Sequence, residues 1–94
     1  MTSPIISVLM SVYNSDEYLK EAVDSILNQS FDDFEFLITD DCSTDQSWEI
    51  LSEYAANDQR IRLIKNETNL GLTKSLNQSL GLAKGKYIAR QDGD

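Results

Sequence analysis

Two aspartates one residue apart, Asp92 and Asp94, follow an apolar segment at the end of the 94-residue sequence. The apolar residues 87–89 predict that this segment is the end of a buried strand. Alternate residues of a strand point to the same face, so the two carboxylates would lie side by side. Such a pair suits a hard divalent cation, which prefers oxygen ligands. The Asp92-Gly93 dipeptide is equally typical of a plain turn, and the motif alone does not separate the two interpretations.

A second acidic cluster consists of Asp40 and Asp41, with Asp45 four residues further on. A carboxylate at the end of a strand is a good acceptor for an N–H donor such as a nucleobase imide. Asp45 is predicted to cap the helix that follows it. We expect the Asp40–Asp41 pair to lie at a strand end that neighbours Asp92. That arrangement favours the metal interpretation, because like charges that lie close together need a cation or a raised pKa.

The composition excludes several classes of function. The net charge of −8 argues against nucleic acid as a partner and against an anionic membrane face, because both require a basic surface. One cysteine and no histidine exclude a Cys/His zinc site and a Ser-His-Asp triad within this chain. The common glycine-rich phosphate loops are absent as well. A bound phosphate would therefore need a metal and side chains, among which Lys74 is a candidate, although a lone lysine on a helix is often only a solvent-facing charge.

Hydrophobic periodicity predicts four strands, over residues 5–12, 34–39, 61–64 and 86–91. Helices are predicted between them, over residues 16–27, 46–56 and 72–83. The first helix has an apolar stripe made of Leu19, Ala22, Val23, Ile26 and Leu27. The third has one made of Leu72, Leu76, Leu80 and Ala83. We expect both stripes to face the core.

The order β-α-β-α-β-α-β predicts an α/β fold with a parallel sheet, right-handed crossovers and helices on both faces. Ligands of such sheets bind beyond the carboxyl ends of the strands, at the point where the strand order reverses. The polar residues gather at those ends in this sequence: Asn14, Asp40, Asp41, Asn66, Asn69, Asp92 and Asp94. The sequence therefore predicts a polar ligand site at one edge of the sheet.

A set of motifs in fixed order resembles the start of family 2 glycosyltransferases and extends over essentially all of residues 1–94. Each motif is loose, but the ordered set is specific. The segments that carry the resemblance are Ser7–Asn14, Leu27–Phe31, Asp33–Glu35, Asp40–Asp45, Asn69–Gly71, Asn77, Ala83–Ile88 and Asp92–Asp94.

The resemblance implies a Rossmann-like GT-A fold and the transfer of a sugar, with inversion, from a nucleotide donor that is usually UDP-linked. It implies that Ser11, Val12 and Tyr13 line the nucleoside pocket. It also implies that Asp41, with Asp40 beside it, holds the uracil and ribose side. Asp92 and Asp94 match the D-x-D motif of the family. Asp94 would bind the Mn²⁺ or Mg²⁺ ion that bridges the donor diphosphate, and Asp92 would contact the ribose or the metal shell.

Inversion needs a base that deprotonates the acceptor hydroxyl. In the family this base lies well downstream of D-x-D. We therefore interpret residues 1–94 as the N-terminal, nucleotide-sugar-binding part of a transferase domain, without a catalytic residue of its own and inactive alone. The acceptor would be a saccharide or a lipid-linked one, in cell-surface polysaccharide or glycolipid synthesis.

The sequence contains neither a signal peptide pattern nor an apolar run long enough to cross a membrane. We therefore expect a cytoplasmic protein that associates with membranes, if at all, through a C-terminal part missing from this chain. Apolar surface left uncovered by such a truncation would favour self-association of the fragment.

Two alternatives come from other functional classes. A receiver-like signalling module is also a small acidic α/β domain, but it needs an acidic pair after the first strand and a lysine after the last aspartate. Here residues 11–14 contain no acid, and no lysine follows Asp94. A non-catalytic nucleotide-binding domain is the other alternative, and the 94 residues do not decide against it.

Overall fold

The computed structural model describes residues 4–29 and 32–92. Its seven elements follow the predicted order: β1 (Ile6–Val12), α1 (Asp16–Leu27), β2 (Phe34–Asp40), α2 (Ser47–Asn57), β3 (Ile61–Lys65), α3 (Leu72–Leu82) and β4 (Tyr87–Asp92). Each predicted boundary lies within one residue of the observed one. No helix in the described ranges combines the length and the apolar character needed to cross a bilayer.

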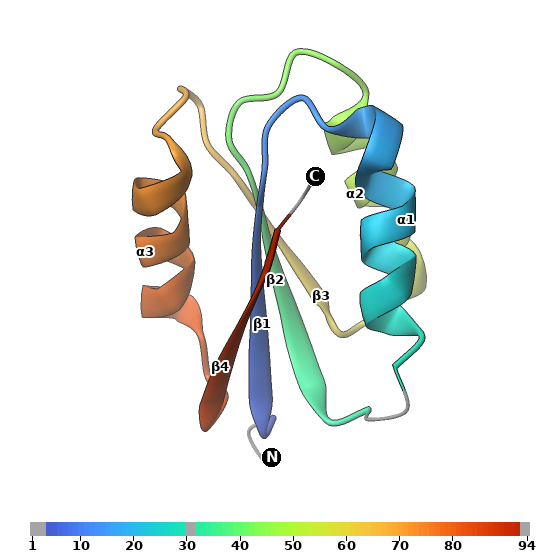
Figure 1. Ribbon diagram of the computed structural model, residues 1–94, viewed down its shortest axis with the longest axis vertical. Helices are drawn as coiled ribbons and strands as arrows, with labels where there is room; N and C mark the ends of the chain where they lie inside the picture. The colour runs from blue at the N-terminus through green and yellow to red at the C-terminus, as the bar shows by residue number, and fades with distance from the viewer. Residues whose placement is uncertain (1–3, 30–31, 93–94) are drawn as a thin grey trace.

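The four strands form one parallel sheet in the order β3-β2-β1-β4. Helices α1 and α2 cover one face of the sheet and α3 covers the other (Figure 1). The chain runs outward from β1 through β2 to β3, and then crosses back to place β4 on the free side of β1. The predicted α/β, Rossmann-like architecture with helices on both faces is confirmed.

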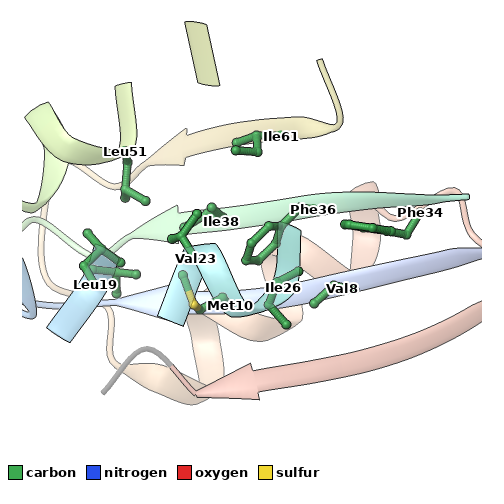
Figure 2. Packing of buried hydrophobic residues seen from close by; sticks show 11 residues of the cluster. Val8, Met10, Leu19, Val23, Ile26, Phe34, Phe36, Ile38, Leu51 and Ile61 are labelled. Atoms are coloured by element: carbon green, nitrogen blue, oxygen red, sulfur yellow. The ribbon is translucent and has the colours of Figure 1, made fainter. Parts of the chain in front are cut away.

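The hydrophobic core lies between the sheet and helices α1 and α2 (Figure 2). Strand β2 is buried along its whole length, because β1 and β3 flank it and helices cover both of its faces. The predicted stripe of α1 is confirmed, since Leu19, Val23 and Ile26 are at most 4% exposed. These residues pack against Met10 and Phe36 of the two central strands.

The predicted stripe of α3 is wrong for Leu72 and Leu80, whereas Leu76 and Ala83 are partly buried. Leu72 and Leu80 are 50% and 49% exposed, whereas Ser75 and Ser79 are completely buried. Ser79 Oγ shares a hydrogen bond with Thr39 Oγ1 of β2. Small hydroxyl side chains let the helix approach the sheet closely while their polar atoms stay paired. The contact face of α3 is thus polar, and its leucines lie on the flank and the outside.

The expectation that residues 87–89 end a buried strand is also wrong. Tyr87 and Ile88 are 59% and 47% exposed. The reason is the strand order, because within residues 4–29 and 32–92 β4 lies at the edge of the sheet and pairs with β1 alone. No residue of β4 belongs to the hydrophobic cluster of the described residues.

Two leucine truncations test this assignment of the core. Leu19→Ala should lower the free energy of unfolding by about 2–4 kcal/mol, because it leaves a cavity in a packed interior. Leu80→Ala removes the same atoms from an exposed helix position and should cost less than about 1 kcal/mol. Urea unfolding followed by circular dichroism measures both changes. Equal losses in the two variants would show that α3 packs through its leucines after all.

Candidate functional site

The carboxyl ends of all four strands meet at one edge of the sheet, together with the loops that follow them (top of Figure 1). Val12 is paired in register with Asp40, and Ser11 with Asp92. The prediction that Asp40–Asp41 and Asp92 lie at the ends of neighbouring strands is wrong, because β1 lies between β2 and β4. Two strand spacings of about 4.8 Å separate Asp40 from Asp92, so one cation does not directly bridge these two strand ends.

Asp40 is completely buried at the end of β2. Its Oδ1 accepts a hydrogen bond from Ser43 Oγ at 2.5 Å, and Ser43 Oγ in turn accepts one from the N–H of Asn14 at 3.0 Å. Within residues 4–29 and 32–92, Asp40 Oδ2 is the buried side-chain oxygen that has no hydrogen-bond partner. Buried carboxylate oxygens are costly without a donor, so this atom is an open acceptor at the predicted nucleotide edge.

Asp41 is 3% exposed and has donors on both oxygens. Oδ1 accepts hydrogen bonds from Asn66 Nδ2 at 2.9 Å and from the N–H of Leu70 at 2.7 Å. Oδ2 accepts one from the N–H of Gly71 at 2.8 Å. Burial acts to raise the pKa of Asp41, but these donors outweigh it and leave the pKa below its ordinary value. Asp41 therefore fixes the loop between β3 and α3 as a buried carboxylate.

The loops after β1 and β2 hold each other through the starts of their helices. Asp45 accepts hydrogen bonds from the N–H of Ser47 at the start of α2 and from the N–H of Asp16 at the start of α1, at 2.9 and 3.1 Å. Asp16 Oδ2 accepts one from the N–H of Gln46 at 3.2 Å. The start of α2 thus receives contacts from its own loop and from Asp16 of α1, whereas the start of α1 receives its side-chain contact from the loop before α2. Asp45 lies one residue before the N-cap position, Gln46, and it supplies the predicted contact to the start of α2 and a second contact to the start of α1.

The remaining predicted nucleoside and phosphate residues differ in exposure. Val12 is completely buried and Ser11 is half-buried, whereas Tyr13 is 49% exposed on the loop beyond β1. Tyr13 precedes Asn14, whose φ of 47° lies in the left-handed region and turns the chain toward α1. Lys74 is exposed on the first turn of α3, at the same edge of the sheet. The tyrosine ring and the lysine are thus the predicted groups that a ligand reaches without displacing protein.

The predicted metal ligands lie at the limit of what the structure describes. Asp92 is placed only as the last residue of β4, opposite Ser11, while Gly93 and Asp94 lie outside the described residues. In the ranges 4–29 and 32–92, no three Asp, Glu, Cys or His side chains gather in a way that could hold a metal ion. A cation at this edge would therefore take one or two carboxylates plus ligand oxygens, which is a common arrangement for Mg²⁺.

Asn66, which the sequence analysis placed at this edge without a role, and Ser43, which it did not assign, both have defined contacts in the site. Asn66 is 5% exposed and donates from Nδ2 to both Asp41 and Ser75 Oγ. Ser43 links Asp40 to the loop after β1. The sequence features that indicate them are local: Asn66 directly follows a strand, and Ser43 lies three residues after an aspartate at a turn.

The pKa of Asp41 gives a pH-dependent prediction. Because the pKa is lower in the folded state, this stabilisation is present above the unfolded value near 3.8 and is lost as the pH falls through the folded pKa. Asp41→Asn should therefore lose about 1–3 kcal/mol of stability at pH 7 and show a shallower decline as the pH falls below about 4. Urea unfolding across that range measures both effects. Glu67→Gln, an exposed carboxylate in the same loop, should leave the profile unchanged.

Comparison with known proteins gives consistent matches. A family model described as Glycosyl transferase family 2 matches residues 7–94. EpsE of Bacillus subtilis, assigned as a glycosyltransferase, is 48% identical over 94 residues, which cover 99% of this chain and 34% of that protein. TuaG of the same organism, assigned to teichuronic acid biosynthesis, is 40% identical over 91 residues, which cover 97% of this chain and 36% of that protein.

A solved structure shows the same fold. The crystal structure of S. aureus TarS 1–349 in complex with UDP-GlcNAc aligns with a TM-score of 0.89 and 34% identity, over 96% of this chain and 26% of that one. The chain spans about a third of the length of the curated relatives it matches. The family model covers nearly the whole chain and the fold agrees with it. The chain therefore belongs to glycosyl transferase family 2.

Proposed function

We propose that this chain forms the nucleotide-sugar-binding part of an inverting glycosyltransferase that uses a UDP-linked donor. One observation carries the proposal: in a family 2 chain, four polar or aromatic residues follow the strand ends at one edge of the sheet. They are the exposed Tyr13 after β1, Asp40 with its unpaired oxygen at the end of β2, Lys74 at the start of α3 and Asp92 at the end of β4. These groups suit the base, the diphosphate and a bridging metal ion of a nucleotide sugar. The UDP-GlcNAc complex of the similar TarS supports the choice of donor.

The roles follow from exposure and hydrogen bonding. Ser11, Val12 and Tyr13 would form the wall against the nucleoside, with the exposed Tyr13 ring available for stacking. Asp40 and Asp41 would form the floor on the base and ribose side. Asp40 contributes an open acceptor that a donor N–H would reach after the loop above it shifts. The ammonium of Lys74 would attract the diphosphate.

Asp92 and Asp94 would hold a Mn²⁺ or Mg²⁺ ion. A divalent cation neutralises the charge that builds on a departing nucleoside diphosphate. The catalytic base and the saccharide or lipid-linked acceptor site are proposed to lie outside this chain, so that the isolated 94 residues bind donor without transferring sugar. TuaG's assignment to teichuronic acid biosynthesis supports a product in cell-surface polysaccharide synthesis. The receiver-like alternative has no support from a chain of this family.

Calorimetric titration of the chain with UDP tests donor binding. Binding should require Mn²⁺, disappear when EDTA is added, and weaken at least about tenfold in Asp92→Asn, because the diphosphate then faces an unneutralised charge and a weaker metal site. Asp33→Asn is the matched control, an exposed aspartate that precedes β2 at the opposite end of the strand. Equal, metal-independent binding in both variants would contradict the assigned site.

We further propose that the isolated chain self-associates through its exposed apolar side chains. Those on α3 and β4 are Leu72, Leu80, Leu82, Tyr87 and Ile88. Exposed apolar side chains that gather on neighbouring elements favour association in water. Sedimentation equilibrium should show a mean mass that rises with concentration, and Leu80→Gln should reduce the rise. A monomer at every concentration would refute this expectation.

A further inference from the structure

A buried polar cluster lies at the opposite end of the sheet from the nucleotide edge. Its centre is Glu35 of β2, which is 6% exposed. Glu35 Oε2 accepts hydrogen bonds from Ser7 Oγ and from the N–H of Lys84, both at 2.6 Å, and Oε1 accepts one from Arg62 Nη1 at 2.9 Å. Burial acts to raise the pKa of Glu35, but the donors outweigh it and keep the pKa below its ordinary value of 4.5. The carboxylate is therefore charged and fully engaged at neutral pH.

The turn between α3 and β4 lies directly against β1 at this cluster. The N–H of Gly85 donates to Ser7 Oγ at 2.7 Å. A Cβ atom at position 85 would come within 2.5 Å of the Ser7 backbone nitrogen and 2.7 Å of the Ile6 carbonyl carbon. A residue with a side chain does not fit there without moving the backbone. The absence of a side chain at Gly85 therefore permits the close contact between this turn and β1, which hydrogen bonds from the turn to Glu35 and Ser7 hold in place.

The same cluster also holds the end of α3. Arg62 of β3 donates to the carbonyl oxygen of Leu82 at 3.2 Å while it pairs with Glu35. The last residue of α3 and the turn after it are thus tied to β1, β2 and β3 together. Pairing of β4 begins two residues beyond Gly85, where the N–H of Tyr87 donates to the carbonyl oxygen of Ile5 at 2.9 Å.

Burial does not fix the register of β4. A strand whose alternate side chains are buried on one face resists slipping, since a shift by one residue exposes its apolar side chains. Tyr87 and Ile88 are already more than 40% exposed on this edge strand. The turn where β4 starts is therefore a main determinant of the register that pairs Ile6 with Tyr87 and Ser11 with Asp92.

We propose that Glu35 is a positioning residue of the donor site, which fixes the turn before β4 and thereby places Asp92 opposite Ser11. A slip of one residue would move Asp92 by about 3.3 Å along the strand and turn it to the other face of the sheet. The inference rests on the proposed role of Asp92 in donor binding. It also explains why the segments Asp33–Glu35 and Ala83–Ile88, which are far apart in the sequence, both belong to the motif set: they meet in this cluster.

Hydrogen exchange by NMR on the 94-residue chain separates positioning from general stabilisation. In Glu35→Gln, the β4 amides that bond to β1 should exchange at least about tenfold faster, while those between β2 and β3 change far less, because β2 and β3 stay paired and β2 stays buried after the contact with Arg62 is weakened. Affinity for UDP with Mn²⁺ should fall about tenfold in parallel. Ser7→Ala, which removes the hydroxyl shared by Glu35 and Gly85, should have the same effects in weaker form and serves if Glu35→Gln fails to fold.

Glu49→Gln is the control, an exposed glutamate on α2 whose loss should change neither readout. The proposal is overturned if β4 stays protected and UDP affinity is unchanged in the Glu35 and Ser7 variants, or if all strands lose protection equally. If wild type does not bind UDP, the proposed function fails. Exchange of the β4 amides then still decides whether Glu35 holds the strand.

Discussion

The structure depends on β1 having a parallel partner on each side. Val8, Met10 and Val12 turn one face of this strand into the core, and β2 and β4 occupy its two edges. A parallel strand in this position must be covered on both faces, which the apolar sequence of β1 and the helices on each side achieve. Because the chain reverses its direction across the sheet at β1, the carboxyl ends of β1 and β4 form the switch point where ligands of such folds bind. The location of the candidate site is therefore a consequence of the strand order.

The two faces of the sheet pack against their helices through different kinds of interaction. The face toward α1 and α2 is apolar and gains stability from burial. The face toward α3 contains the buried Leu9 and Leu37, and around them three polar groupings, which centre on Glu35, on the Thr39–Ser79 pair and on Asp41. Hydrogen bonds are directional, so these contacts fix where α3 and its flanking loops lie more narrowly than apolar packing would. The hydrogen bonds of the α3 face thus fix geometry, while the larger apolar cluster under α1 and α2 supplies most of the burial.

The sequence predicted what depends on local pattern. Element order and boundaries follow from periodicity and turn residues, and α1 buries the stripe that its spacing predicts. What failed depends on neighbours that are distant in sequence. Leu80 is exposed because α3 approaches the sheet through serines, and Ile88 is exposed because β4 lies at an edge. The pattern of leucines on α3 gives no indication of which strand residues lie opposite it, so periodicity alone chose the wrong face.

Asp40 and Asp41 are adjacent in sequence but have different roles in the site. Adjacent residues at a strand end point to opposite faces, so Asp40 follows Ile38 toward α1 and α2, and Asp41 follows Thr39 toward α3. On the α3 side, a loop rich in N–H donors fully engages Asp41. On the other side, Asp40 meets a single hydroxyl and keeps one oxygen free. The two carboxylates read as one motif in sequence, yet in the fold one is committed to holding a loop and the other retains an open acceptor at the nucleotide edge.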